Sequence, residues 1–220
     1  MREPLPARAA ADPGDPILCL VVDAASSRGA RTREVGEACG AGVDWLQLRD
    51  RELAGAAWLD WAESLAQSAR ANAPGIRIIA NRRLDMALAM GADGVHLGFD
   101  AASPGDARTL MGPNALVGAS THAPSEIACL APDEIDYVHL APIYAPLSKP
   151  ASRPELGLAL LARACEGPIP VIAQGGLGPE RCSAVIRAGA AGIAVTGGIL
   201  AARNPADAAA GLRAALDGGR

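Results

Sequence analysis

The sequence has few aromatic residues: three Trp, two Tyr and one Phe in 220 residues. Half of the residues are apolar, which is too many for a disordered chain, so Ala, Leu, Val and Ile must form the core. Nucleic-acid-binding proteins stack bases on aromatic side chains and pair phosphates with basic blocks. This chain lacks such a block and carries a net charge of −4, so we expect no nucleic-acid partner.

Long apolar runs are also absent. No stretch approaches 18 unbroken apolar residues, so we expect no transmembrane helix and no membrane partner. Residues 1–16 contain charges and prolines without the apolar stretch of a signal peptide, and we expect a flexible lead-in there. The five cysteines lie in apolar stretches without Cys-x-x-Cys spacing, which predicts buried, reduced thiols in a cytoplasmic protein.

No composition break follows residue 16, so we expect one domain over residues 17–217. A short apolar pattern recurs four times, at Gly42–Leu48, Ala92–Leu97, Ile135–Leu140 and Ala190–Val195. Four further apolar runs alternate with these copies, at Ile17–Val22, Ile76–Ala80, Leu116–Ser120 and Pro170–Ala173. Each run precedes an Ala-rich segment of helical length, and eight such units predict an α/β fold, a parallel (β/α)8 TIM barrel. A doubly wound open sheet is the alternative, but Asp23–Ser27 lacks the GxGxxG fingerprint.

Glycines and polar residues gather at the predicted carboxyl ends of the strands, where TIM barrels carry their active sites. Gly175-Gly176 and Gly197-Gly198 follow the last two strands. A backbone without Cβ atoms can approach an anion closely, and helix N-termini offer free N–H groups. These two glycine pairs therefore predict a phosphate site.

Five cations follow the predicted strands and indicate an anionic substrate: Arg49, Arg51, Arg82, Arg83 and Lys149. They disfavour a dense divalent-metal site, which needs paired carboxylates. Among the loop residues, His122 is the candidate for proton transfer, because an imidazole titrates near working pH. We interpret His96 and His139, which lie within strands, as structural.

Five segments carry a family resemblance: QLRDREL (47–53), IIANRRLDMALAMGADGVHLG (78–98), VGASTHAPSE (117–126), DYVHLAPIYAPLSKP (136–150) and PVIAQGGLGPERCSAVIRAGAAGIAV (170–195). In order and spacing they resemble the thiamin phosphate synthase / thiazole tautomerase (TenI-type) family. The resemblance implies a (β/α)8 barrel and a small phosphorylated thiazole as partner. Members are often oligomeric, so it also raises a homo-oligomer as an expectation.

Synthases of this family join an aminopyrimidine methyl diphosphate to a thiazole phosphate, with Mg²⁺ holding the diphosphate. By resemblance, the residues facing the pyrimidine and its diphosphate would be Arg49, Arg51, Asn81, Ser120 and Lys149. Gly176, Thr196 and Gly197 would bind the thiazole phosphate.

The sequence departs from the synthase pattern where metal ligands are expected. Arg82 stands where synthases usually have an Asp, and Ala101 replaces the second Asp, with Asp100 one position early as a weak candidate ligand. The loop that grips the diphosphate has Pro146 in place of a Thr, leaving Ser148 and Lys149. Without the metal carboxylates, the ion that offsets the diphosphate charge is lost.

These departures favour the tautomerase branch, which isomerises a thiazole carboxylate phosphate by a proton shift and needs no cofactor. The resemblance then implies that His122 moves the proton, that Gly175, Gly176 and Gly197 anchor the phosphate, and that Arg49 or Lys149 meets the carboxylate. One alternative is a divergent thiamin phosphate synthase that uses Mg²⁺. Another is a non-catalytic barrel that binds a phosphorylated ligand.

Overall fold

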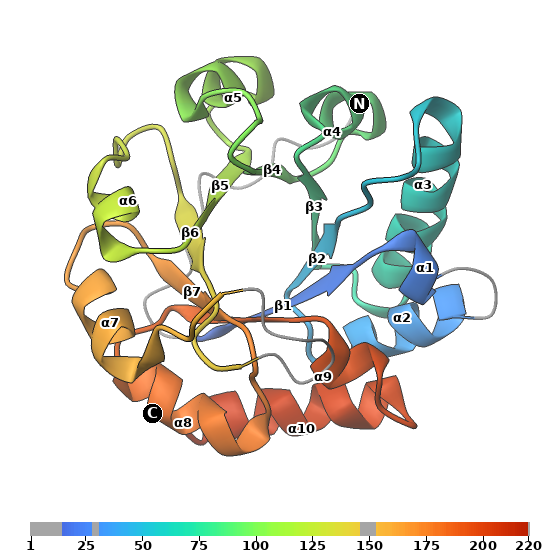
Figure 1. The fold of residues 1–220 in the computed structure, drawn as a ribbon. Coiled ribbons are helices and arrows are strands. Elements are labelled where there is room, and N and C mark those ends of the chain that lie inside the picture. The colour runs from blue at the N-terminus through green and yellow to red at the C-terminus, as the bar shows by residue number, and fades with distance from the viewer. Residues whose placement is uncertain (1–14, 28–30, 146–152, 220) are drawn as a thin grey trace.

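The computed structural model describes residues 15–27, 31–145 and 153–219. Eight parallel strands close into a barrel in chain order, and the last strand pairs with the first (Figure 1). The strands are β1 (Ile17–Val22), β2 (Trp45–Leu48), β3 (Arg77–Asn81), β4 (Gly94–Leu97), β5 (Leu116–Thr121), β6 (Tyr137–Leu140), β7 (Val171–Gln174) and β8 (Gly192–Val195). The predicted TIM barrel is confirmed, and the open sheet is excluded.

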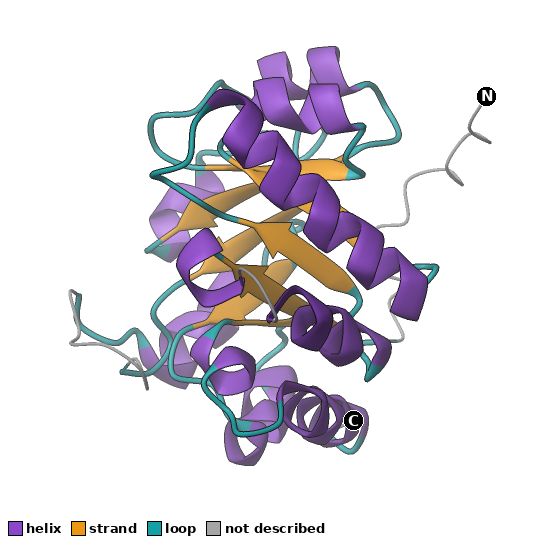
Figure 2. Cartoon of the chain, turned by 90° about the vertical axis from the view of Figure 1, so that its right-hand side faces the viewer, coloured by secondary structure: helices purple, strands orange, loops and turns teal. Residues whose placement is uncertain are grey.

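Helices surround the strands (Figures 1 and 2). They are α1 (Ala24–Ser27), α2 (Arg31–Gly40), α3 (Gly55–Asn72), α4 (Leu84–Met90), α5 (Pro104–Met111), α6 (Pro124–Ala128), α7 (Gly157–Ala164), α8 (Pro179–Arg187), α9 (Gly197–Leu200) and α10 (Pro205–Asp217). None of them within the described ranges has the length and apolar character needed to cross a bilayer. Residues 1–14 of the predicted lead-in lie outside the described ranges.

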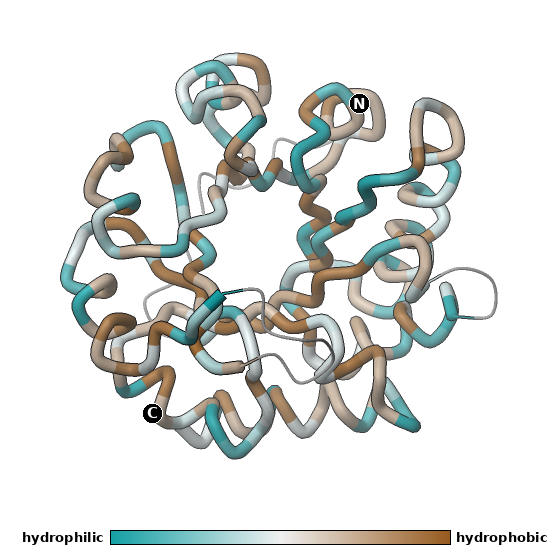
Figure 3. Tube along the Cα trace, viewed as in Figure 1, coloured by the Kyte–Doolittle hydropathy of each residue, from teal (hydrophilic) through white to brown (hydrophobic). Residues whose placement is uncertain are grey.

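The strands are buried on both faces, which is why they are continuous apolar runs (Figure 3). Leu, Val, Ile and Ala side chains fill the space between the strand ring and the helices. A separate inner core fills the barrel with Ile17, Cys19, Val21, Trp45, Ile79, Leu116, Tyr137, Ile172 and Ala194. Toward the carboxyl end the inner core gives way to the buried polar side chains of Gln47, Asn81, His96 and His139, although Val21 and Ala194 also reach the cavity there.

Three copies of the recurring sequence pattern place an Asp just before an even-numbered strand. Each of these carboxylates accepts the N–H of a residue in the preceding strand and pairs with an Arg from an outer helix. The sets are Asp44 with Leu18 and Arg213, Asp93 with Ile78 and Arg70, and Asp136 with Val117 and Arg108. The repeated Asp therefore fastens adjacent strands to a helix at the amino end of the barrel.

The cysteine prediction is correct in part. All five thiols are free, and Cys19, Cys39 and Cys182 are buried. Cys165 is half-buried, and Cys129 is exposed. Cys129 caps the carboxyl end of the short helix α6, in which Ile127 is the buried residue.

Candidate functional site

A cavity of about 720 Å³ lies at the carboxyl end of the barrel, and residues following all eight strands contribute to its lining. Most of the described residues that the sequence singled out line this cavity, among them Arg49, Arg51, Asn81, Ser120, His122, Gly175, Gly176, Thr196 and Gly197. Ser148 and Lys149 lie outside the described residues. Asp100 does not line the cavity, because its carboxylate pairs with the Arg82 guanidinium beside it.

Three of the four arginines that line the cavity, Arg49, Arg51 and Arg82, follow β2 and β3, and the fourth, Arg153, follows β6. Burial lowers the pKa of Arg49, the positive charges of Arg51 and Arg82 lower it further, and Asp23 partly offsets them. Among the described residues, no carboxylate lies within 4 Å of the Arg49 or Arg51 guanidinium. This arginine cluster (Arg49, Arg51 and Arg82) is therefore short of negative charge and suited to an anionic ligand.

Arg82 and Arg83 follow β3 but point to different places. Arg82 has a left-handed backbone, with φ of 65°, and its N–H donates to the His96 carbonyl of β4. Arg83 makes two hydrogen bonds to Asp85, at 2.9 and 2.7 Å. Its guanidinium lies 6.0 Å from the Trp58 ring of α3. The expectation that Arg83 joins the cationic rim was wrong, because Asp85 and Trp58 hold it outside the cavity.

Polar side chains on the inner face of the barrel form the cavity floor. Asn81 donates to the Gln47 side-chain oxygen at 3.0 Å. His96 contacts Ser120 Oγ at 2.9 Å and Tyr137 Oη at 3.2 Å through its two ring nitrogens. Each side chain is thereby fixed before any ligand arrives.

Two histidines lie on this floor, with ring centroids 4.3 Å apart. Burial lowers the pKa of His139 to about 3, and it also lowers that of His96, with help from the nearby charges of His139 and Arg49. Both rings are therefore neutral at pH 7. Interpreting them only as structural overlooked that both line the cavity, as do Gln47 and Gln174. The alternation of side chains along a strand could have predicted this. Residues 45 and 137 fill the barrel interior, and residues 47 and 139, two positions further along, point to the same face.

His122 follows β5 and is held on three sides. Its Nδ1 lies 2.6 Å from the Ala141 carbonyl, its backbone N–H donates to Glu126, and its ring lies 5.2 Å from the Phe99 ring. A carbonyl can only accept, so Nδ1 carries the hydrogen, and Nε2 of the neutral ring is the basic nitrogen. The geometry therefore presents a base at the cavity wall.

The glycine pair after β7 has a packing role of its own. Gly175 and Gly176 have φ of 101° and 61°, and a Cβ on Gly176 would lie 2.2 Å from the Ala145 carbonyl oxygen. Arg181 of α8 donates to the Gly176 carbonyl, and its guanidinium lies 4.4 Å from the Tyr144 ring. Glycine is thus required here by the adjacent loop after β6, whether or not a phosphate binds.

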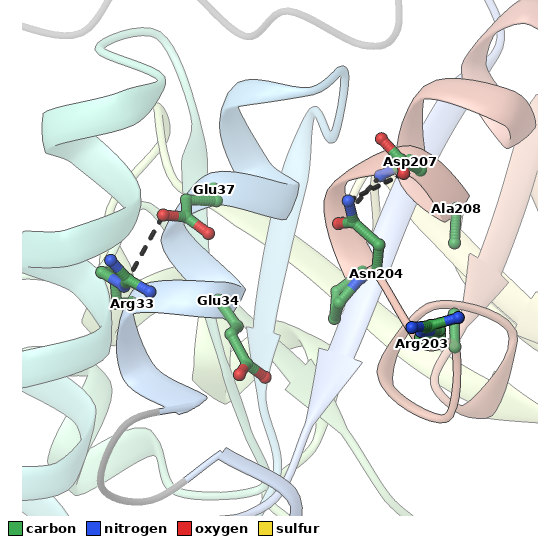
Figure 4. A pocket seen from close by; sticks show the side chains of 9 residues that line it. Arg33, Glu34, Glu37, Arg203, Asn204, Asp207 and Ala208 are labelled. Atoms are coloured by element: carbon green, nitrogen blue, oxygen red, sulfur yellow. Dashed lines mark hydrogen bonds and ion pairs between the residues drawn. The ribbon is translucent and has the colours of Figure 1, made fainter.

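A second, open groove of about 800 Å³ lies between α2 and the segment that starts α10 (Figure 4). Its charges are mixed, since Arg33 and Arg203 line it together with Glu34, Glu37 and Asp207. Asn204 points its side chain at the start of α10 and accepts the N–H groups of Ala206 and Asp207. This groove shares no lining residue with the cavity at the strand ends, and its two cations and three carboxylates leave one excess negative charge, which does not favour an anion.

The chain has relatives among proteins of known family. The protein family described as "Thiamine monophosphate synthase" matches residues 18–199. A protein named thiamine-phosphate synthase, from Laribacter hongkongensis, is 39% identical over 193 residues, which cover 87% of each chain. This chain belongs to the thiamine monophosphate synthase family.

Two further relatives show how the chain compares with known proteins in length and in fold. The chain is 37% identical over 219 residues to the thiamine biosynthesis bifunctional protein ThiM/ThiE of Symbiobacterium thermophilum, covering 99% of this chain but 44% of that protein. The solved thiamine phosphate pyrophosphorylase from Pyrococcus furiosus superposes with a TM-score of 0.79 at 24% identity, covering 94% of this chain and 98% of the other. That likeness supports the fold alone.

The family resemblance implies Mg²⁺, and the residues at the strand ends are a poor fit for it. Asp100, the candidate ligand, is paired with Arg82. Within the described ranges, no three His, Cys, Asp or Glu side chains come together to hold a metal. Mg²⁺ is bound through hard oxygen ligands, carboxylates above all, whereas three guanidinium groups line this wall.

Proposed function

We propose that the chain is a thiamine-phosphate synthase that joins an aminopyrimidine methyl diphosphate to a thiazole phosphate. One observation carries the proposal: the arginine cluster and the glycine segments after β7 and β8 line the same cavity. Two regions for anions suit two phosphorylated substrates. The names of the 37–39% identical relatives support the same reaction.

The charge of the arginine cluster fits a diphosphate better than a carboxylate. The carbon–oxygen bond between the methylene group and the diphosphate breaks as that carbon bonds to the thiazole, and diphosphate leaves with the electron pair. Guanidinium groups form charge-assisted hydrogen bonds to phosphoryl oxygens and favour this departure. Three arginines exceed what a single carboxylate group needs.

In the proposed arrangement, the remaining lining residues hold the two substrates. Arg49 and Arg51 bind the diphosphate, together with Lys149 and Ser148, and Asn81 and Ser120 orient the pyrimidine from the cavity floor. Gly175, Gly176, Thr196 and Gly197 bind the thiazole phosphate through backbone N–H groups. The neutral floor histidines add no positive charge to that of the arginines.

The test is formation of thiamin phosphate from the two substrates, measured with Mg²⁺ and with EDTA. Turnover in either condition that falls at least tenfold in Arg51→Met supports the proposal. Arg203→Met is the matched control, because Arg203 lines the groove between α2 and α10 and not the cavity, and its turnover should equal that of the wild type. Binding of thiazole phosphate without turnover of either substrate set would favour a non-catalytic barrel instead.

A thiazole tautomerase is the second candidate, and the His122 geometry favours it. A proton shift needs a base, and the basic Nε2 of His122 is presented at the wall of a cavity that suits a phosphate. Isomerisation of the thiazole carboxylate phosphate in EDTA, lost in His122→Gln, would establish this activity. Unchanged isomerisation in that variant would remove His122 from the mechanism.

A further inference from the structure

Arg82 occupies a position that the surrounding backbone defines closely. Its φ of 65° is unusual for a residue with a side chain, and its N–H is held by the His96 carbonyl at 2.8 Å. The side chain then runs beside Gly98, where an added Cβ would lie 3.2 Å from Arg82 Cγ. The end of β3 and the glycine after β4 therefore make room for this one side chain.

Asp100 anchors the far end of Arg82. The ion pair joins Arg82 Nη2 to Asp100 Oδ2, while Arg82 still lines the cavity. The carboxylate is 64% exposed and the guanidinium 32% exposed, so the pair sits at the rim with the cation on the inner side. Asp100 is used to orient a guanidinium and is no longer available as a free oxygen ligand.

The sign of the local charge decides which ion this wall attracts. The three arginines face two carboxylates, Asp23 near Arg49 and Asp100 beside Arg82. Before any substrate binds, the wall is therefore net positive and repels a divalent cation. A bound diphosphate reverses that balance and relieves the repulsion among the arginines.

We infer that the arginine cluster binds a diphosphate group directly, with the guanidinium of Arg82, held by Asp100, in the role that a divalent cation would otherwise fill. The identity of the diphosphate as part of the pyrimidine substrate rests on the proposed function. The binding of a diphosphate anion without metal does not rest on it.

Calorimetric titration with inorganic pyrophosphate tests the inference without any turnover. In EDTA the wild type should bind pyrophosphate, and added Mg²⁺ should not tighten the binding. Arg82→Asn removes the guanidinium and keeps a residue that tolerates the left-handed backbone, so the fold is preserved. This variant should bind at least tenfold more weakly.

Arg83→Asn is the matched control, since Arg83 is the next residue, carries the same charge and lies outside the cavity. It should bind pyrophosphate within twofold of the wild type. The inference is overturned if wild-type binding requires Mg²⁺, if neither condition gives binding, or if Arg82→Asn binds as tightly as Arg83→Asn.

A second experiment tests whether a change at residue 82 makes pyrophosphate binding depend on Mg²⁺. Arg82→Asp places a carboxylate beside Asp100 and removes its cationic partner, which creates paired oxygen ligands for Mg²⁺. Pyrophosphate binding by this variant should become weaker in EDTA and recover at least tenfold with Mg²⁺. If Mg²⁺ restores no binding, the Arg82 guanidinium does not take the place of a divalent cation. If metal-free binding holds but no thiamin phosphate forms, the proposed function fails and this inference stands.

Discussion

The two ends of the barrel use arginine in opposite ways. At the amino end, Arg70, Arg108 and Arg213 each pair with an Asp that also accepts a strand N–H. At the carboxyl end, Arg49 and Arg51 have no carboxylate within ion-pair distance among the described residues, and burial and like charge lower the pKa of Arg49. Paired arginines stabilise the fold, whereas clustered arginines store an electrostatic cost that an anion can relieve. Arginine pairing alone therefore distinguishes the amino end of the barrel from the carboxyl end.

The largest expected effect is on stability at the amino end. Asp136→Asn leaves Arg108 without its anion in a site where the Asp side chain is 1% exposed. Removing one partner of such a pair costs about 3–5 kcal/mol, and urea denaturation should show a loss of about 3 kcal/mol. Asp44→Asn is the control: that carboxylate is 46% exposed, so the loss should be about 1 kcal/mol or less. Equal losses of stability in the two variants would show that burial of the carboxylate is not the cause of the larger effect.

The next effect is on activity at the carboxyl end. Arg49→Met should lower kcat/KM for thiamin phosphate formation about 100-fold, which corresponds to about 2.7 kcal/mol of transition-state stabilisation. Its free energy of unfolding should stay the same or rise, because the variant removes a half-buried cation that two other cations repel. Steady-state kinetics and urea denaturation on one preparation measure both. A variant that loses stability and keeps its activity would place Arg49 with the structural arginines.

The two ends also differ in how far their roles could be predicted from sequence. The strands were predictable because burial on both faces makes each a continuous apolar run, and the barrel then brings the strand ends together. Sequence could not separate Arg82 from Arg83, since only the backbone turn at Arg82 and the Asp85 partner of Arg83 decide which one enters the cavity. Nor could it show that Gly176 is required by the Ala145 carbonyl, because that contact joins loops after different strands. Relatives named thiamine-phosphate synthase favour the alternative that the sequence placed second.

Unfolding measured as a function of pH tests the carboxyl end of the barrel, because two neutral imidazoles lie on the cavity floor there. The pKa of His139 is lowered to about 3 in the fold, against about 6.5 in an unfolded chain. The unfolded state therefore binds more protons below pH 6.5, and His139 should remove about 1.4 kcal/mol of stability per pH unit as pH falls toward 3. Above pH 6.5 it should have no such effect. Urea denaturation of His139→Asn between pH 4 and 6 should show a correspondingly shallower loss, and parallel curves would contradict the assignment.

The smallest effect is expected in the groove between α2 and α10, which has charges of both signs and shares no lining residue with the cavity (Figure 4). Glu37 pairs with Arg33 at 3.6 Å, and their side chains are 47% and 81% exposed. Exposed pairs spaced four residues apart on a helix contribute about 0.3–0.5 kcal/mol. Glu37→Gln should therefore change the free energy of unfolding by no more than about 0.5 kcal/mol and leave pyrophosphate binding as it is. A clear loss of pyrophosphate affinity would mean that long-range charge, rather than the local arginine cluster, determines anion binding. The unpaired arginines at the carboxyl end would then not explain why an anion binds there.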